Sequence, residues 1–361
     1  MYYDKIDYTV IKKAWNILEN HISIPYVIHI VGTNGKGSTG RFIASFLSQE
    51  NKTVLHYSSP HIMKFNERIW IDGNNSSDIE LNKAHKKLQD ILNSDIIEKL
   101  TYFEYTTLIA LLLSHKKDFV VLEAGLGGEF DATNVVKNNL SVIPSIGLDH
   151  QEFLGDTIKE IATTKLKSCD ESFIFGLNIN SEVIEVKNEI LKDKKELIVD
   201  KNISFKNDLP EYLENNLKLA LSVLKYLNFD SKIYKLPKLF GRYQKISSNI
   251  TIDVGHNPLA AKVIQQELLK EKKKVVLVYN SYKDKDYCSV LKILKPVIKE
   301  VQIIDCNDSR MINKNKLQHE INNLSLKSIN FDIMNLDVED YYLVFGSFIV
   351  VENFLKGYKN I

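Results

Sequence analysis

This sequence has only three cysteines and almost no net charge. The first argues against a disulfide-stabilised protein, and the second against nonspecific binding to nucleic acid or membranes. Lys and Arg number 47 against 46 for Asp and Glu, which leaves a formal net charge of +1. No large positive field is therefore available for nonspecific binding to nucleic acid or to a membrane surface. The three cysteines share no C-x-x-C spacing and leave one unpaired in any disulfide scheme, which favours a reduced, cytoplasmic chain.

Long apolar runs are lacking as well. No stretch approaches the roughly 18 consecutive apolar residues that a membrane-spanning helix needs. The N-terminal segment MYYDKIDYTV contains acidic residues and no apolar block, so we expect no signal peptide. An apolar share of 44% with 26% charged residues is ordinary for a globular protein.

Short apolar runs alternate with helical patterns along the chain, which predicts βαβ units and a mostly parallel sheet. A helix is expected from Ser38 to Gln49, and another after Asp208 as its N-cap with Pro210 in the first turn. Segment 234–244 contains Pro and Gly and has little periodicity, so we place a domain boundary there. Strands are expected over 26–31, 53–59, 118–125, 140–147, 172–176, 274–279, 301–305 and 341–347.

The segment IHIVGTNGKGSTG, from Ile28 to Gly40, nearly matches the phosphate-loop pattern G-x-x-x-x-G-K-[ST]. The first glycine of that pattern would fall at Ile30, and Ser38 stands one place late, behind Gly37. A strand, a Gly-rich loop and an amphipathic helix are nevertheless the context that a phosphate loop requires. We expect Lys36 to neutralise the β- and γ-phosphates, and Ser38 to cap the helix or contact a metal. A Gly-rich turn without a ligand is the alternative.

Polar and acidic residues follow several of the predicted strands, at the edge where open α/β sheets bind ligands. Ser58 and Ser59 end one strand, Glu123 ends another, and Asp149 and His150 follow a third. A carboxylate beside a phosphate loop is how nucleotide enzymes hold Mg²⁺. The competing interpretations are capping hydroxyls, an incidental acid in a glycine-rich turn, and a histidine that bonds locally.

Two further segments carry polar groups. In TIDVGHNPLA, Asp253, His256 and Asn257 end a strand of the second half, and Pro258 suits the first turn of a helix. In FNERI, Arg68 lies in a loop, where a solvated arginine is the alternative to a ligand contact.

Taken together and in this order, the motifs resemble those of the folylpolyglutamate synthase/dihydrofolate synthase family, a branch of the Mur-ligase-type amide ligases. The resemblance covers nearly the whole chain. It depends on GTNGKGS, YSSPH, FNERI, TYFEY, LEAGLGGEFDATN, LDH, FGRYQ, DVGHNP, KDKD and FGSF. The phosphate loop of the family has an extra glycine between Lys and Ser, which is the feature that Gly37 reproduces.

The resemblance implies an α/β fold with a P-loop nucleotide- and folate-binding domain over residues 1–236 and a smaller Rossmann-like glutamate-ligase domain over 237–361. It implies ATP as cofactor with two Mg²⁺ ions, one held by Ser59 and Glu123 and the other by His150. The implied ATP contacts are Asn34, Gly35, Lys36, Gly37, Ser38, Asn216, Arg242 and Asp253. The implied folate contacts are Arg68, Phe103, Glu104, Asp131, Ala132 and Thr133.

Three residues are catalytic candidates under the resemblance, namely Lys36, Lys165 and His256. Lys165 matches the lysine that the family carbamylates to supply a metal-binding carboxylate, and an ordinary surface lysine is the alternative. His256 matches the histidine that faces the nucleotide from the second domain.

The implied activity is addition of L-glutamate to dihydropteroate, to tetrahydrofolate or to both, through an acyl phosphate, by a cytoplasmic monomer without nucleic-acid or membrane partners. Two alternatives stay open. A Mur-type peptide ligase is disfavoured because the phosphate loop begins at residue 32, before which we expect no UDP-binding domain. A binding protein that has lost catalysis is suggested by TKLKS around Lys165 and by GSFIVV near the C-terminus. The N-terminal IDYTVIKK keeps Asp7 but lacks the glycine of the dihydropteroate-binding segment of the family.

Overall fold

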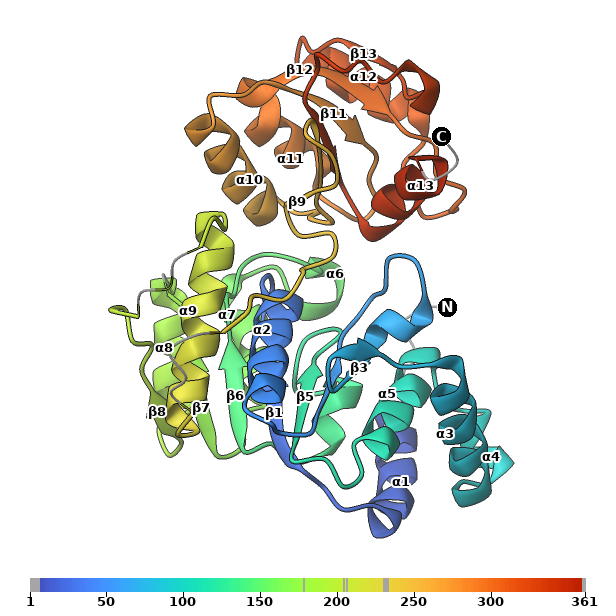
Figure 1. The fold of residues 1–361 in the computed structure, drawn as a ribbon, viewed down its shortest axis with the longest axis vertical. Helices are drawn as coiled ribbons and strands as arrows, with labels where there is room; N and C mark the ends of the chain where they lie inside the picture. The colour runs from blue at the N-terminus through green and yellow to red at the C-terminus, as the bar shows by residue number, and fades with distance from the viewer. Residues whose placement is uncertain (1–6, 178, 204, 206, 230–233, 359–361) are drawn as a thin grey trace. The chain divides into compact units, whose positions relative to one another are not determined.

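The computed structural model describes residues 7–358 with the exception of 178, 204, 206 and 230–233. The chain forms two compact units, each with its own sheet (Figure 1). Unit 1 comprises Met1–Leu209 and Leu213–Pro237, and unit 2 comprises Pro210–Tyr212 and Lys238–Ile361. The assignment of nucleotide and folate binding to the first unit and of glutamate ligation to the second stays a prediction.

The sheet of unit 1 has the strand order β4-β3-β2-β5-β1-β6-β7-β8. The run from β2 to β8 is parallel, whereas β3 and β4 pair antiparallel. Its strands are β1 (Tyr26–Ile30), β2 (Val54–Tyr57), β3 (Ile69–Ile71), β4 (Asn74–Asn75), β5 (Phe119–Glu123), β6 (Leu140–Ile143), β7 (Ser172–Phe175) and β8 (Lys195–Leu197). Strand β5 is completely buried and β1 almost completely. Both are largely apolar, as expected for strands of a parallel sheet that is covered on both faces.

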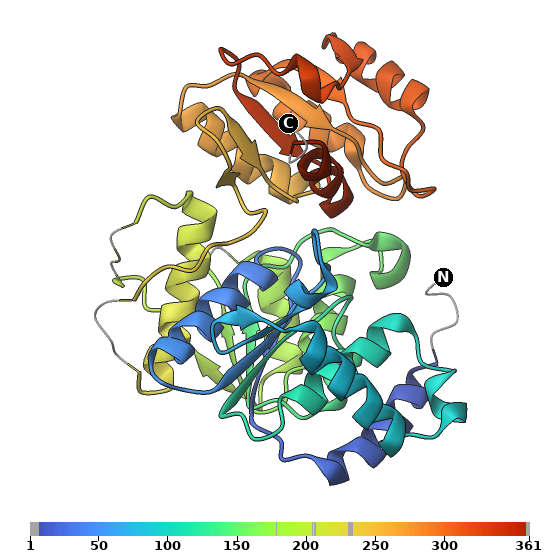
Figure 2. The same ribbon diagram turned by 45° about the vertical axis from the view of Figure 1, so that its right-hand side comes forward.

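Helices cover both faces of this sheet. On one face, the side chains of Val27, Leu55 and Leu122 join a buried cluster with α1, α3 and α5. The other face is covered by α2, whose Gly40 is close to Ile30, and α2 lies against the sheet in both ribbon views (Figure 2). The helices of unit 1 and the continuous α9 are α1 (Tyr8–Leu18), α2 (Lys36–Gln49), α3 (Asp78–Ile91), α4 (Ser94–Ile97), α5 (Tyr102–Leu113), α6 (Gln151–Leu154), α7 (Ile158–Leu166), α8 (Ser181–Ile190) and α9 (Glu211–Tyr226).

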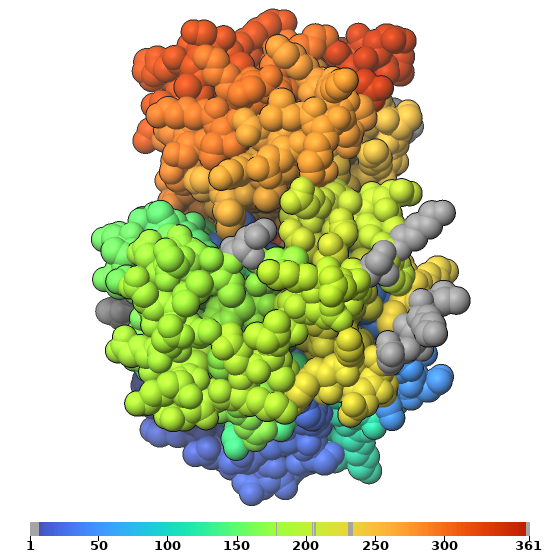
Figure 3. Space-filling view, turned by 90° about the vertical axis from the view of Figure 1, so that its left-hand side faces the viewer, coloured from blue at the N-terminus to red at the C-terminus, as the bar shows by residue number. Residues whose placement is uncertain are grey.

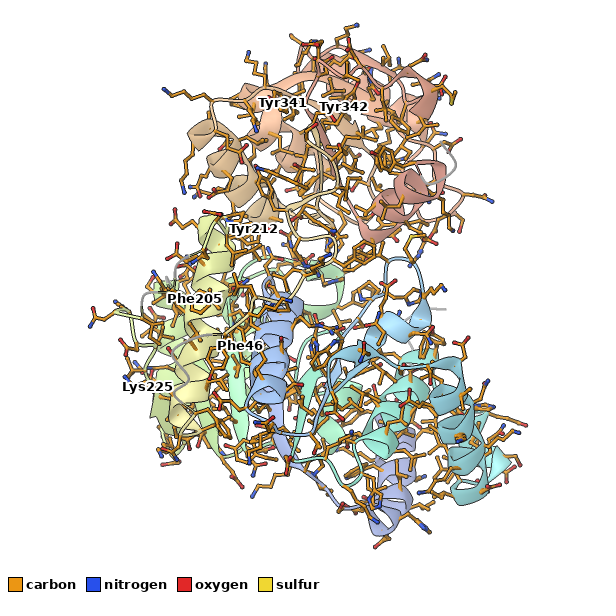
Figure 4. The ribbon with its side chains drawn as sticks, viewed as in Figure 1. Phe46, Phe205, Tyr212, Lys225, Tyr341 and Tyr342 are labelled. Carbon is orange, nitrogen blue, oxygen red and sulfur yellow. The ribbon has the colours of Figure 1, made fainter. Side chains whose placement is uncertain are left out.

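Local sequence explains where several of these helices begin. Ser77, Thr101 and Thr157 each cap a helix and exchange hydrogen bonds with the glutamate three residues later. Along the outer surface of unit 1, α8 and α9 lie on the side shown in Figure 3. Phe46 of α2 stacks on Tyr234 with the ring centroids 4.5 Å apart, and Figure 4 labels Phe46.

Unit 2 has a second sheet with the order β13-β12-β11-β14-β10-β9, in which only β9 is antiparallel to its neighbour. Its strands are β9 (Gln244–Lys245), β10 (Ile250–Ile252), β11 (Val275–Tyr279), β12 (Ile298–Ile303), β13 (Ser328–Asn330) and β14 (Tyr342–Phe345), and its helices are α10 (Pro258–Lys270), α11 (Tyr287–Leu294), α12 (Lys314–Asn323) and α13 (Phe348–Tyr358). Residues of β11, β12 and β14 share a buried core with α10, α11 and α12.

The predicted α/β fold class, with a mostly parallel sheet in each half, is confirmed. The expected start of the helix near residue 208 is wrong: α9 begins at Glu211, so Pro210 precedes it and Asp208 is not its N-cap. Asn207 supports the preceding turn instead, because its side chain accepts the Leu209 N–H at 2.9 Å.

Candidate active site

Four adjacent parallel strands bring the predicted phosphate and metal residues to one edge of the sheet of unit 1. The order β2-β5-β1-β6 places Ser59 after β2, Glu123 at the end of β5, the phosphate loop after β1 and His150 after β6. Parallel strands present their carboxyl ends at a common edge. The topology therefore aligns Ser59, Glu123, the phosphate loop (residues 32–38) and His150 in that order along the edge.

The phosphate loop makes the tight strand-to-helix turn that its glycines predict. Gly35 has φ of +84° and stands at the N-cap of α2, a conformation that glycine adopts without the steric penalty of a side chain. A Cβ at Gly32 would lie 2.8 Å from the backbone oxygen of Ser145, so the loop passes close to the end of β6. Ser38 is not the N-cap, because α2 already begins at Lys36 and the Ser38 hydroxyl donates to the Gly35 oxygen at 3.1 Å.

Asn216 of α9 lies against this turn. Its side-chain amide donates to the Ser38 hydroxyl at 2.9 Å, and a Cβ at Gly35 would lie 2.8 Å from its Oδ1. Asn216 is buried, so α9 fixes the start of α2. Asn216 is thus brought to the nucleotide loop, while its predicted contact with adenine stays a prediction.

Two lysine amines share one backbone acceptor in the phosphate loop. The Nζ atom of Lys36 donates to the carbonyl of Gly32 at 3.0 Å and to that of Thr33 at 3.2 Å, and Lys165 Nζ donates to the same Gly32 carbonyl at 3.0 Å. Lys165 comes from the last turn of α7 and is 4% exposed. Burial, and next the charge of Lys36, lowers the pKa of Lys165 from 10.5 to about 7. Lys165 is therefore no ordinary surface lysine.

The metal-ligand candidates of β2 and β5 meet directly. The backbone N–H of Ser59 donates to Oε2 of Glu123 at 3.3 Å, and Glu123 is 5% exposed. His150 has φ of +52° and its Nε2 lies 4.0 Å from Oδ2 of Asp149. Within the part of the chain that the structure describes, no three His, Cys, Asp or Glu side chains form a metal-holding cluster.

The donor set nevertheless suits Mg²⁺. Glu123 and Ser59 offer oxygen ligands, and this ion keeps several waters and phosphate oxygens in its coordination shell rather than a cage of protein side chains. Ser59, Glu123 and His150 include only one carboxylate and one histidine, so they could bind Mg²⁺ without forming a cluster of three acidic, His or Cys side chains. Ser59, Glu123 and His150 stay the predicted ligands.

Phe103 lies at the start of α5 and packs against Gly125, in the loop that follows β5. A Cβ at Gly125 would lie 2.7 Å from the Phe103 ring, so only glycine permits this approach. The same ring stacks on Tyr57 with the centroids 5.8 Å apart. Phe103 is therefore held beside the loop that follows β5, which we call the pterin-side loop (residues 125–135).

Asp131 organises the pterin-side loop from within. Its Oδ1 accepts from the Thr133 N–H at 3.0 Å and from the Thr133 hydroxyl at 2.5 Å, while its Oδ2 accepts the Leu126 N–H at 2.7 Å. Burial raises the pKa of Asp131, and these hydrogen bonds oppose the rise. Asp131, Ala132 and Thr133 are all at most 5% exposed.

Glu104 is the second buried carboxylate on this side. One oxygen accepts the Thr101 N–H at 2.8 Å and so caps α5. The other, Oε1, has no hydrogen-bond partner among the described residues, although Glu104 is 3% exposed. A buried carboxylate oxygen without a donor is costly, and an N–H group of a ligand would satisfy it.

Arg68 is enclosed by aromatic rings rather than solvated. Its Nε donates to Nδ1 of His61 at 2.9 Å, and its guanidinium lies 5.4 Å from the ring centroid of Tyr102 and 5.9 Å from that of Phe65. Arg68 is 9% exposed, so the solvated alternative is excluded. Tyr102 directly precedes Phe103, so Arg68 is linked to the start of α5.

In unit 2, Asp253 is the centre of a satisfied network. Its carboxylate accepts from the Gly255 N–H at 2.7 Å, from the Tyr243 N–H at 2.8 Å and from the Tyr212 hydroxyl at 3.0 Å. Burial raises the pKa of Asp253, and the charge of Arg242 opposes this. Figure 4 labels Tyr212, which stands at the start of α9.

Arg242 and His256 occupy loops of the same unit. The Arg242 guanidinium lies 5.2 Å from the ring centroid of Phe348 and donates to the Gly241 oxygen at 3.3 Å. The Nδ1 atom of His256 lies 3.2 Å from the oxygen of Val254. The ATP contacts predicted for Arg242 and Asp253, and the catalytic role predicted for His256, stay predictions.

Two residues with clear structural connections to these sites were missed by sequence reasoning. His29 is the fourth of the five residues of β1, with Nε2 2.8 Å from the Thr133 hydroxyl. A single polar residue inside the apolar run YVIHIV was the signal that could have identified it. Tyr212 carried no comparable signal, because a tyrosine near the start of an amphipathic helix is common.

The fold and site define a P-loop-containing α/β protein with two sheets, and comparisons with known proteins give its family. The family model that matches is the Mur ligase middle domain, over residues 30–245. A relative named dihydrofolate synthase/folylpolyglutamate synthase, from Haemophilus influenzae, is 32% identical over 391 aligned positions, which cover 92% of this chain and 88% of that protein.

Solved structures agree with the sequence match. The crystal structure of Helicobacter pylori folylpolyglutamate synthetase is 37% identical, with a TM-score of 0.78, and covers 99% of this chain and 96% of that one. A bifunctional folylpolyglutamate synthase/dihydrofolate synthase with Mn, AMPPNP and L-glutamate bound is 26% identical, with a TM-score of 0.84 and coverage of 98% and 94%. This chain belongs to the Mur ligases, and among them to the dihydrofolate synthase/folylpolyglutamate synthase family.

Proposed function

We propose that this protein is an ATP- and Mg²⁺-dependent ligase that adds L-glutamate to a pterin carboxylate, either dihydropteroate, tetrahydrofolate or both. The observation that carries the proposal is the shared edge of unit 1. There Glu123, the phosphate loop with Lys36, and Lys165 converge, while Phe103 packs against the loop that follows the same strand as Glu123. A nucleotide-binding protein without ligase activity would need no buried second lysine at the phosphate loop.

The reaction joins a carboxylate to an amine, which is uphill in water without activation. A carboxylate oxygen of the pterin substrate attacks the γ-phosphorus of ATP, and ADP leaves with the bond electrons. The glutamate amine then attacks the acyl carbon of the resulting acyl phosphate, inorganic phosphate leaves, and the amine loses a proton. Mg²⁺, when bound, supplies positive charge that offsets the repulsion between ATP and the carboxylate.

The residues of this chain bind and orient the reactants. In the proposed complex, Lys36 leaves the carbonyls of Gly32 and Thr33 and binds the β- and γ-phosphates, and the N–H groups at the start of α2 would donate to the same anion. In the proposed complex, Phe103 beside Gly125 and Asp131 within the pterin-side loop border the pterin ring. Holding the reactants in this way can lower the barrier by about 7–11 kcal/mol.

Carbamylation of Lys165 belongs to the same proposal. Only a neutral amine adds to carbon dioxide, and the reaction yields a carbamate and one proton. A pKa of about 7 leaves much of Lys165 neutral at physiological pH, whereas an ordinary lysine is almost entirely protonated there. The carbamate would add a carboxylate-like ligand to Ser59, Glu123 and His150. The departure TKLKS from the family pattern leaves this lysine in place.

The test is an assay of purified protein with ATP, Mg²⁺, L-glutamate and either dihydropteroate or tetrahydrofolate. We expect phosphate release that requires both glutamate and a pterin. If neither pterin gives glutamate-dependent phosphate release, the proposal is overturned. Normal ATP binding without turnover would favour a member that has lost catalysis. Competing the two pterins in one reaction shows which activity the protein has.

Carbamylation has its own readout. Protein depleted of bicarbonate should lose activity and regain it when bicarbonate is added, whereas Lys165→Met should remain inactive in both buffers. Turnover by Lys165→Met equal to that of the wild type would exclude the carbamate.

A cytoplasmic monomer completes the proposal. Every described helix is too short or too polar to cross a membrane. The three cysteines are free, and burial raises the pKa of Cys169 to about 12, so this thiol is kept in its unreactive form. Sedimentation of the purified protein with and without ATP tests the monomeric state.

A further inference from the structure

The neighbourhood of His29 contains a polar connection that none of the assigned residues explains. His29 is the fourth residue of β1 and is 1% exposed, with apolar neighbours on either side in the strand. Its Nε2 lies 2.8 Å from Oγ1 of Thr133, which is also 1% exposed. The Nδ1 atom has no hydrogen-bond partner among the residues that the structure describes.

The direction of each hydrogen bond in this group follows from the chemistry of its members. Oδ1 of Asp131 accepts both the N–H and the hydroxyl of Thr133. The hydroxyl proton of Thr133 is therefore used on Asp131. Its oxygen must then accept from His29, which assigns the neutral Nε2–H tautomer to the imidazole.

This tautomer agrees with the burial of the ring. Burial lowers the pKa of His29 to about 4, so the imidazole is neutral at physiological pH and has one proton to donate. The orphaned Nδ1 atom is the cost of this arrangement, because a buried acceptor without a donor is unfavourable. An apolar side chain would fill the same place in β1 without that cost, so the Nε2–H···Oγ1 bond is the feature that distinguishes histidine here.

The three side chains join two loops that serve different substrates. β1 runs from His29 directly into the phosphate loop, whereas Thr133 and Asp131 belong to the pterin-side loop after β5. Asp131 in turn accepts the Leu126 N–H at 2.7 Å and so fixes the opposite end of that loop. A displacement of Thr133 would thus move the whole pterin-side loop relative to β1.

We propose that His29 is a positioning residue that, through Thr133, holds the Asp131 carboxylate and the pterin-side loop in register with the phosphate loop. The inference rests on the proposed function, in that the loop is taken to hold the pterin. Its consequence is that loss of this bond weakens the hold of the pterin-side loop on the pterin and leaves the phosphate loop unchanged. His29 itself touches no reactant.

The test compares substitutions that remove the bond with substitutions that keep it. Thr133→Val removes the hydroxyl and preserves the shape of the side chain, whereas Thr133→Ser keeps the hydroxyl. His29→Leu removes the donor, and His29→Gln offers an N–H group at a similar reach. His56→Leu is the matched control, because His56 is an equally buried histidine on β2 whose ring nitrogens have no partner among the described residues.

We expect Thr133→Val and His29→Leu to raise the KM for the pterin about five- to tenfold while the KM for ATP stays at the wild-type value. Thr133→Ser and His29→Gln should restore the pterin KM, and His56→Leu should leave it unchanged even if it alters the unfolding midpoint. The double variant His29→Leu/Thr133→Val should be no worse than either single variant, because both remove the same bond.

The outcomes separate this inference from the proposed function. Unchanged pterin KM in His29→Leu and Thr133→Val, together with a raised KM in Asp131→Asn, would overturn the role of His29 alone. Equal loss in His29→Leu and His56→Leu, or additive effects in the double variant, would overturn it as well. An Asp131→Asn variant with a wild-type pterin KM would show that the pterin lies elsewhere, and a wild-type chain without pterin-dependent turnover would refute the proposed function itself.

Discussion

Replacing Lys165 with methionine should abolish ligase turnover and, at the same time, stabilise unit 1. Lys165 is 4% exposed, and its pKa falls from 10.5 to about 7 because the protonated amine is desolvated in the folded chain. The unfolded chain therefore binds the proton more readily between these two pH values. The unfolding free energy of the wild-type chain is therefore expected to rise as the pH increases from about 7 to 10.5. Below pH 7 the destabilisation caused by burying Lys165 is present in full.

The magnitude follows from the pKa difference. At 1.36 kcal/mol for each unit, the shift corresponds to about 5 kcal/mol across the whole window, and about 2.7 kcal/mol of this develops between pH 6 and pH 9. Methionine has a similar length and no charge, so it removes this pH dependence and keeps the packing at the end of α7. The gain in unfolding free energy of Lys165→Met over the wild type should be largest at pH 6 and shrink towards pH 9.

The assay is urea unfolding at both pH values in bicarbonate-free buffer, followed by tryptophan fluorescence. Both tryptophans of the chain, Trp15 and Trp70, lie in unit 1, so the signal reports the unit that contains Lys165. Lys167→Met is the matched control, since Lys167 is exposed and pairs with Glu129 at 3.1 Å on the surface, where ion pairs contribute little. A gain that is the same at pH 6 and pH 9 would refute the argument that Lys165 is desolvated.

Three further predictions concern other residues of the two units. Gly35→Ala should weaken binding of an ATP analogue, measured by calorimetry, and destabilise unit 1 by about 1–2 kcal/mol, because alanine is strained at φ of +84°; undiminished affinity would contradict this. Tyr212→Phe should cost about 1–3 kcal/mol by depriving buried Asp253 of a donor, and thermal unfolding at the wild-type midpoint would count against it. His29 has a folded pKa of about 4 against 6.5 when exposed, so protons favour the unfolded chain and stability should fall by about 3 kcal/mol as the pH drops from 6.5 to 4; His29→Gln should remove that fall, and an identical acid profile would disprove the assignment.

The fold class could be predicted from the sequence because its signals are local and repeated. Each buried parallel strand is an apolar run, and each helix after it has apolar residues at helical spacing, so the alternation alone indicates the architecture. Boundaries were less reliable where several polar residues compete for one turn. Asp208 was the expected cap, but α9 begins at Glu211, and Asn207 holds the turn before it by accepting the Leu209 N–H. Ser38 was similarly expected as a possible cap, although glycine at position 35 makes the turn.

The contacts around the site were less predictable than the motifs. Short motifs identified Lys36 and Glu123, because phosphate loops and strand ends have recognisable residue types, whereas Lys165 came only from the resemblance to the family. No pattern could show that Lys36 and Lys165 meet at one carbonyl, since they are separated by most of unit 1 in the sequence. The bond between His29 and Thr133 likewise depends on the parallel pairing of β1 with β5, which places distant residues side by side.

The buried polar groups of the two units differ in a way that bears on function. In unit 2, Asp253 accepts three hydrogen bonds from its own unit and closes a structural network. In unit 1, Lys165 is desolvated, Oε1 of Glu104 has no partner among the described residues, and the same is true of Nδ1 of His29. Each of these lowers the stability of the chain, and a stretch of sequence under selection for stability alone would replace them with apolar side chains. Lys165 at the phosphate loop and His29 on the strand that leads into it therefore indicate that this edge of unit 1, rather than the Asp253 network, is where the chain gives up stability for chemistry.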